Sequence, residues 1–142
     1  MSVSNESGYQ SRLELSLFLL RLGVFVVMLA WTVDKIVNPL HAIEIFQNFY
    51  FIQGISEGGM ITLGVIELVF IQVFLAGLWK PYTYGLIILL HTISAIAPWE
   101  KYTVELGATY SMLYYADWSM LAACITLYVL RDLDVKFILG QK

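Results

Sequence analysis

Four long apolar runs, separated by shorter polar stretches, constrain this chain more than any other feature of its sequence. They cover residues 13–33, 60–78, 82–97 and 110–130. A helix needs about 20 residues, at 1.5 Å of rise each, to cross a hydrocarbon core of about 30 Å. The runs therefore predict an all-α, polytopic membrane four-helix bundle, with residues 1–142 forming a single membrane domain.

The composition agrees with a lipid environment and excludes several other classes. Hydrophobic residues make up 59% of the chain and charged residues 13%, with a mean hydropathy of +0.74, whereas about a quarter of a soluble domain is charged. A net charge of −3 leaves no basic surface for nucleic acid. The stretch before the first run lacks the basic cluster of a secretory signal peptide, so we expect that run to be a membrane span.

The segment between the first two runs, residues 34–59, is too long for a simple turn and has an apolar, aromatic centre. Asn38-Pro39 supplies a helix start. We expect an amphipathic outer-loop segment that lies on the membrane, and an extended lid is the alternative that the sequence leaves open.

The loop charges predict the orientation, because four spans place both termini on the same side. Cytoplasmic loops carry an excess of Lys and Arg. We therefore expect a multi-pass protein of the cell inner membrane with both termini in the cytoplasm. The cations on the terminal side are Arg12, Lys80, Arg131, Lys136 and Lys142, against Lys35 and Lys101 on the other side.

Each run carries an ionisable side chain well inside its apolar stretch. A charge at the bilayer centre costs about 2.5–3.5 kcal/mol, so such residues usually face the bundle interior and pair. Depths counted from the inner ends place Arg21, Glu67 and His91 in one layer about 12–16 Å deep. We expect Arg21 and Glu67 to form an ion pair. Two roles are open for these residues: they could hold the helices together, or they could bind a ligand and relay protons. The four residues are Arg21, Glu67, His91 and Asp117.

A second set of polar and aromatic residues stands near the expected outer ends of the spans. These side chains would line an outer mouth to a polar axis of the bundle. The set is Trp31, Asp34, Lys35 and Trp99.

Metal chemistry has little support in the sequence. The only histidines are His41 and His91, and the single cysteine, Cys124, has no basic neighbour, so we expect it to pack rather than react. No metal site and no cofactor motif is evident. Aromatic walls beside an arginine and a histidine suit a planar ligand such as a quinone, whose carbonyl oxygens accept hydrogen bonds.

The first two runs carry a pattern that resembles the DoxX family. The resemblance extends to chain length and span number, but its motifs lie within residues 20–39 and 64–80. Asn38 departs from the pattern, since the family more often has an acidic residue before the proline. The matching residues are Leu20-Arg21-Leu22-Gly23, Phe25, Trp31, Asp34-Lys35 and Pro39, then Gly64, Glu67-Leu68, Leu75, Gly77-Leu78 and Lys80.

The resemblance implies a four-helix membrane protein of the kind often associated with redox systems, including a quinone-linked thiosulfate oxidoreductase. By this resemblance, Arg21, Lys35 and Glu67 correspond to functional residues of the family. We expect a DoxX-like inner-membrane subunit or partner of a membrane redox system, with Arg21, Glu67 and His91 around a quinone-type pocket.

Two other functions stay open from the sequence. One is a small-solute binding or transport module that opens outward. The other is a structural membrane anchor, with residues 46–51 as the surface that contacts a partner protein. The expected partners are the lipid membrane and a redox subunit or a second copy of the chain.

Overall fold

The computed structural model describes residues 3–104 and 111–139 of the chain, and the regular elements in this part are all helices. Of these helices, four are long, one is shorter and lies in the outer loop, and one is a single short turn-like helix. They are α1 (Val3–Val37), α2 (Pro39–Phe49), α3 (Glu57–Leu75), α4 (Lys80–Ile96), α5 (Trp99–Val104) and α6 (Ser111–Val129).

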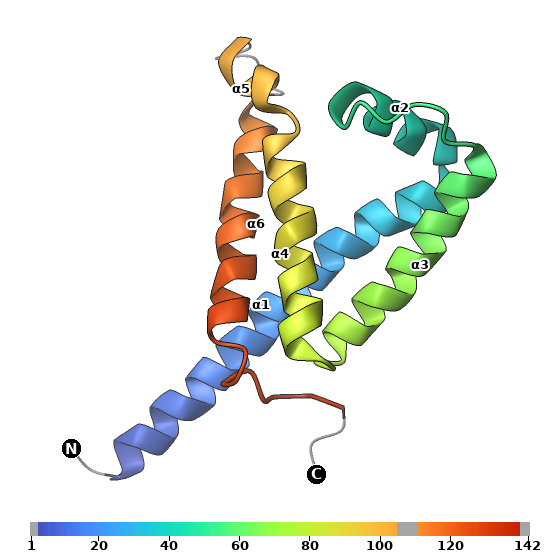
Figure 1. The fold of residues 1–142 in the computed structure, drawn as a ribbon. Coiled ribbons are helices and arrows are strands. Elements are labelled where there is room, and N and C mark those ends of the chain that lie inside the picture. The colour runs from blue at the N-terminus through green and yellow to red at the C-terminus, as the bar shows by residue number, and fades with distance from the viewer. Residues whose placement is uncertain (1–2, 105–110, 140–142) are drawn as a thin grey trace.

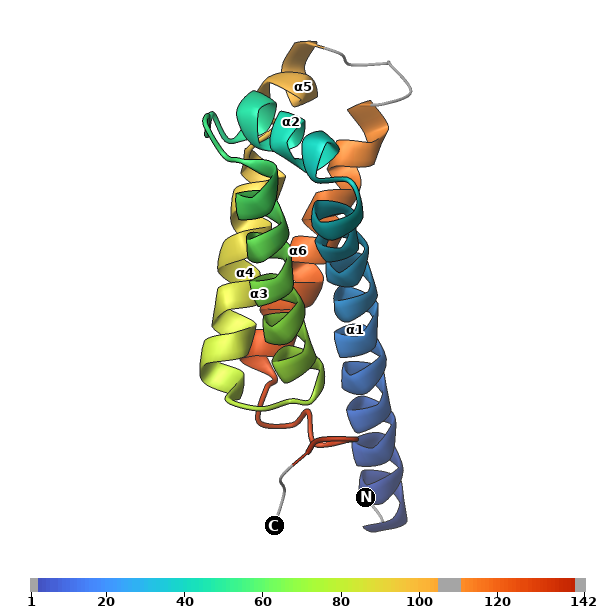
Figure 2. The same cartoon turned by 90° about the vertical axis from the view of Figure 1, so that its right-hand side faces the viewer.

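The long helices form two antiparallel pairs, α1 with α3 and α4 with α6. Figure 1 shows the pairs meeting at one end and diverging toward the other. We call the first the inner end, formed by the α3–α4 turn at residues 76–79 and the C-terminal segment at residues 130–139. The other is the outer end, where α2 and α5 lie (Figure 2).

The predicted runs match the long helices closely. The runs 60–78 and 82–97 correspond to α3 and α4, and the last run corresponds to α6, although residue 110 lies outside the described residues. The expected all-helical fold is therefore confirmed for the described residues. The run 13–33 lies within α1, which continues through the polar residues before position 13 and protrudes past the inner ends of α4 and α6 (Figures 1 and 2).

The outer loop contains a helix, so the extended lid is wrong. Pro39 occupies the first turn of α2, where its missing N–H would have no helical partner. Ala42 is buried against the bundle, whereas the adjacent His41 is exposed. The side-chain oxygen of Ser56 then caps α3 by accepting from the Gly59 N–H at 3.1 Å.

The core lies between the helix pairs near the inner end. Phe74 of α3 packs edge-on against Tyr84 of α4, with ring centroids 5.1 Å apart. Cys124 is buried in this core, as expected for a packing residue. The other buried members include Leu17, Val24, Met28, Ile71, Ile87 and Leu127.

In the part of the chain that the structure describes, two helices are long and apolar enough to cross a membrane, namely the part of α1 from Glu6 to Val37 and the whole of α3. Their most apolar windows are only 28% and 22% buried within the fold. Large apolar side chains such as Ile66 and Val69 therefore face outward from the bundle.

Candidate functional site

The four ionisable side chains expected inside the apolar runs lie in three separate places. Arg21 is at the inner end, where it contacts the C-terminal segment. Glu67 lies on the face of α3 that meets α1. His91 of α4 and Asp117 of α6 interact electrostatically with each other. The predicted pair between Arg21 and Glu67 is therefore wrong.

Arg21 is fully buried and pairs with Asp134 of the C-terminal segment. Its Nη1 donates to Oδ2 of Asp134 at 2.8 Å, and both side chains have 0% exposed surface. The Tyr84 hydroxyl donates to the same oxygen at 2.6 Å. Nη2 of Arg21 donates to the main-chain oxygen of Lys136 at 2.8 Å. A buried guanidinium requires an anion and further acceptors, and one segment supplies both.

Lys80 holds the same segment from the start of α4. Its Nζ donates to the main-chain oxygens of Asp134 at 2.6 Å and Arg131 at 3.1 Å. We call Arg21, Lys80, Tyr84 and Asp134 the inner cluster. Because the guanidinium and the carboxylate have no exposed surface, the inner cluster joins α1, α4 and the C-terminal segment and is closed to a ligand.

A glycine makes room for the inner cluster. Gly77 has a φ of +68°, and a Cβ at this position would lie 2.8 Å from Cγ1 of Ile138 and 3.2 Å from Nη1 of Arg21. Glycine is the residue that adopts this left-handed conformation without a steric cost. The turn after α3 can therefore pass directly beneath the guanidinium.

Glu67 pairs with Lys35 across the interface of α1 and α3. The two charged groups lie 3.0 Å apart, and their side chains are 12% and 15% exposed. Nearby, Gly64 allows the helices to approach, since a Cβ there would lie 2.8 Å from Cγ1 of Ile36. The ion pair and the glycine contact together define the register of α1 against α3.

His91 presents a buried polar atom that lacks a hydrogen-bond partner. The residue is 5% exposed, and its Nε2 has no partner among the described residues. The other such side-chain atoms in the described chain belong to Arg21, Arg131 and Asp134, all at the inner end. Among these atoms, Nε2 of His91 is the one that lies away from the inner cluster. The charged group nearest in effect to His91 is the half-buried carboxylate of Asp117.

Tyr102 of α5 closes the outer end of the α4–α6 pair. Its hydroxyl, which has one proton to donate, lies within hydrogen-bond distance of two main-chain oxygens, that of Ala95 at 2.8 Å and that of Tyr114 at 3.1 Å. Burial, and then the negative charge of Asp117, raise the pKa of the Tyr102 phenol. The phenol therefore stays protonated and keeps its donor role.

The residues expected to form an outer mouth are divided between different contacts. Asp34 lies 2.7 Å from Nδ1 of His41 on α2, and Lys35 is in the pair described above. Trp99 lines a small hollow of about 40 Å³ with Phe49 and Phe51. Trp31 lies on α1 and is exposed. The predicted common mouth is therefore not formed by these side chains.

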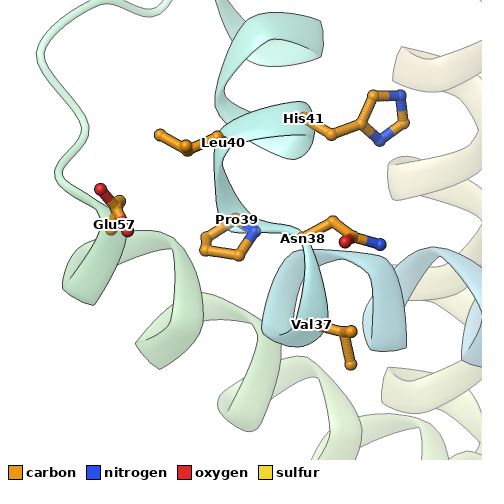
Figure 3. Close-up of a pocket in the computed structure, with 6 residues that line it drawn as sticks. All are labelled: Val37, Asn38, Pro39, Leu40, His41 and Glu57. Atoms are coloured by element: carbon orange, nitrogen blue, oxygen red, sulfur yellow. The ribbon is translucent and has the colours of Figure 1, made fainter.

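The larger hollow lies where α1 turns into α2 beside the start of α3, and its volume is about 400 Å³. Figure 3 shows that Glu57 and His41 lie on opposite sides of Pro39, so their polar groups do not converge. A small-molecule site normally combines an enclosed pocket with convergent polar groups. The lining residues are Val37, Asn38, Pro39, Leu40, His41 and Glu57.

Neither hollow includes the residues expected around a quinone-type pocket. Arg21, Glu67, His91 and Asp117 are absent from both linings. Within residues 3–104 and 111–139, no group of three or more His, Cys, Asp and Glu side chains is placed to hold a metal ion. The unpartnered His91 Nε2 is thus the feature of the described chain that best fits a ligand contact.

The sequence does not mark Asp134 and Tyr84 as partners of Arg21, nor Lys80 as a residue that holds the same C-terminal segment. Asp134 stands among the charged residues that follow the last apolar run. Its alternation with the apolar Leu133 and Val135 is the signal that could have indicated an inward-facing carboxylate.

Comparison of the chain with protein-family models, with curated proteins and with solved structures finds no match in any of the three. The resemblance to the DoxX family therefore stays a prediction from the residues themselves.

Proposed function

We propose that this chain is a multi-pass protein of the cell inner membrane and a DoxX-like subunit or partner of a membrane redox system, in which His91 binds a quinone-type ligand. The observation that carries the ligand proposal is the buried Nε2 of His91, which has no hydrogen-bond partner among the described residues. A buried polar atom without a partner is costly unless a ligand or water satisfies it.

The outward-facing apolar surface supports a place in the membrane. The core helix of a soluble protein is mostly buried, whereas less than a third of the most apolar windows of α1 and α3 is covered by the rest of the fold. Exposing so much apolar surface to water would oppose folding, and lipid removes this cost.

We infer four crossings, two by α1 and α3, which are long and apolar enough to span a membrane, and two by α4 and α6, which pair with each other. In this topology α1, α3, α4 and α6 each span the bilayer, α2 and α5 lie at the outer surface, and both termini face the cytoplasm. The cations Lys80, Arg131 and Lys136 then lie on the cytoplasmic side, in agreement with the positive-inside rule.

The ligand contact would come from His91 and Asp117. A bound quinone would supply the two-electron, two-proton redox chemistry. The imidazole of His91 would donate a hydrogen bond from Nε2 to a carbonyl oxygen of the ring, and Asp117 would hold or pass a proton next to the imidazole. Both residues lie in the α4–α6 pair, where lipid-soluble ligands could approach from the bilayer.

Arg21 has a different role in this proposal. Its charge is neutralised by Asp134, and the C-terminal segment covers it. Arg21 is therefore a structural residue that positions α1 and α4, and Lys35 and Glu67 similarly hold α1 against α3.

A partner subunit would supply the electrons. The sequence has one cysteine and two histidines, so it offers few residues that could bind a redox centre of its own. The exposed apolar faces of the helices offer area for such a partner within the membrane.

The proposal is tested by binding of a short-chain ubiquinone analogue to the purified protein in lipid nanodiscs. We expect His91→Leu to weaken binding by about tenfold, the effect of one lost hydrogen bond of about 1.4 kcal/mol. His91→Gln, which keeps an N–H donor, should retain more of the affinity than His91→Leu.

The matched control is His41→Leu, which changes the other histidine of the chain at an exposed position on α2. The His41→Leu variant should bind the ubiquinone analogue with the same affinity as the unchanged protein. Absence of binding to the unchanged protein, or equal affinities for His91→Leu and His41→Leu, would contradict the proposal.

A further inference from the structure

The geometry points to a membrane placement in which three strained, exposed aromatic residues, Phe51, Trp79 and Phe137, mark the two lipid–water interfaces, and the C-terminal segment at residues 130–139 lies in the inner interface. This inference rests on the multi-pass placement proposed above. It goes beyond that placement by assigning a lipid-binding surface to a segment that follows the last helix.

The three residues share an uncommon backbone conformation. Within the described chain they are the non-glycine residues with positive φ, at +56° for Phe51, +47° for Trp79 and +54° for Phe137. Bulky residues enter the left-handed region at a cost in free energy. All three are aromatic, and they are 74%, 76% and 68% exposed, respectively. Contacts with lipid would compensate for the strain, since aromatic rings favour the membrane interface.

The spacing of Phe51 and Trp79 along α3 matches the thickness of a bilayer. Phe51 lies shortly before α3 and Trp79 shortly after it, and α3 has 19 residues. At 1.5 Å per residue this helix is about 28 Å long, close to a hydrocarbon core of about 30 Å. Phe51 therefore belongs to the outer interface, and Trp79 belongs to the inner one.

The C-terminal segment has its polar group inside and its apolar groups outside. Asp134 is fully buried against Arg21, whereas Leu133, Phe137 and Leu139 are exposed. A segment surrounded by water would favour the reverse arrangement. The exposed apolar side chains are explained if they enter the boundary between headgroups and acyl chains.

Main-chain contacts place this segment beside Trp79. The Leu139 N–H donates to the Ala76 oxygen at 3.0 Å, which ties the segment to the α3–α4 turn. One side of the Phe137 ring packs on Phe18 of α1, with ring centroids 4.7 Å apart. Trp79 and Phe137 therefore belong to the same end of the bundle.

The residues around this surface favour lipid as its occupant. Tyr82 is exposed next to Trp79, and the exposed Val129 continues the apolar surface from α6 to the C-terminal segment. Lys136 and Arg131 provide cations at the headgroup level of the cytoplasmic leaflet, which is negatively charged. Aromatic rings beside cations are typical of an inner membrane interface.

This placement also explains the length of α1. Its 35 residues extend over about 52 Å at 1.5 Å per residue, well beyond a bilayer core of about 30 Å. Figure 1 shows its N-terminal part protruding past the inner end. Arg21, whose Nη2 donates to the main-chain oxygen of Phe137, therefore lies close to the inner interface and not near the bilayer centre.

The test measures the depth of spin labels on single-cysteine variants. Phe51→Cys, Phe137→Cys and Asp132→Cys are made in a Cys124→Ala background, labelled with a nitroxide and reconstituted in phospholipid vesicles. Oxygen concentrates in lipid, and a nickel chelate stays in water. We expect a several-fold higher ratio of oxygen to nickel collisions at positions 51 and 137 than at the exposed position 132. Leu139→Cys serves as a second inner variant if Phe137→Cys does not assemble.

The outcomes distinguish this inference from the proposed function. A protein that stays with the vesicles but gives equal ratios at positions 137 and 132 would overturn the placement of the C-terminal segment alone. A protein that does not associate with vesicles would overturn the membrane proposal as well. Spin–spin broadening at position 137 that persists on dilution with lipid would show that a second copy covers this surface, and would also overturn the inference.

Discussion

The guanidinium of Arg21 lies 2.8 Å from the carboxylate of Asp134, which is 113 residues later in the chain. This contact joins the first long helix to the segment after the last one. Because neither side chain has exposed surface, each provides the counter-charge that makes burial of the other tolerable.

Removal of the Asp134 charge should destabilise the fold strongly. Asp134→Asn leaves the guanidinium of Arg21 buried without its counter-ion, so we expect a loss of about 3–5 kcal/mol in the free energy of unfolding. Denaturant titration in detergent micelles measures this loss. The control is Asp132→Asn at the exposed neighbouring carboxylate, which should change the value by less than about 0.5 kcal/mol. Equal effects of the two variants would show that the buried pair contributes nothing.

The Tyr84 hydroxyl should contribute through its hydrogen bond to Asp134. Tyr84→Phe removes the donor 2.6 Å from Oδ2 and leaves the ring in the core. We expect a cost of about 1–3 kcal/mol, as for a hydrogen bond to a buried charged group. Tyr82→Phe, at an exposed position two residues earlier, is the matched control in the same unfolding experiment. Equal free energies of unfolding for Tyr84→Phe and the unchanged protein would show that the hydrogen bond to Asp134 does not stabilise the fold.

Substitution of two glycines should test the close approaches of the backbone. Gly77→Ala places a methyl group 2.8 Å from Cγ1 of Ile138 in a left-handed turn, and Gly64→Ala places one 2.8 Å from Cγ1 of Ile36. Both should lower the thermal midpoint of unfolding, because crowding and strain typically cost about 1–3 kcal/mol. Gly23→Ala has no neighbour within 4 Å and should be neutral or stabilising. Lower midpoints for all three alanines would indicate a general effect of the residue change.

The Lys35–Glu67 pair should show energetic coupling. In a double-mutant cycle with Lys35→Met and Glu67→Gln, we expect the two single variants to cost more in sum than the double variant. The coupling should be about 0.5–3 kcal/mol for residues in direct contact and partly buried. Additive effects would mean that the two groups do not interact in the protein.

The helices could be predicted because length and apolarity together are a strong local signal. The runs ending at residues 78 and 97 differ from α3 and α4 by three residues or fewer at each boundary. The polar start of α1 was missed for a physical reason. Backbone hydrogen bonds continue a helix through polar residues once it is nucleated, so hydropathy does not mark its first turn.

The pairing of the charged residues could not be predicted from their positions along the runs. The depth of Arg21 was counted from residue 13, but α1 begins at Val3 and overruns the bundle. Asp134 lies outside every apolar run, so only the path of the C-terminal segment brings it to Arg21. Glu67 was assigned the wrong partner because Lys35 was placed at the outer mouth, whereas its side chain reaches the carboxylate on α3.

The most direct test of this account compares two double-mutant cycles that share Arg21→Gln. One cycle uses Asp134→Asn and the other uses Glu67→Gln, with the free energy of unfolding in detergent micelles as the measured quantity. We predict a coupling of about 1–3 kcal/mol between Arg21 and Asp134, and additivity within about 0.5 kcal/mol between Arg21 and Glu67. Coupling of Arg21 to Glu67 together with additivity between Arg21 and Asp134 would contradict the account.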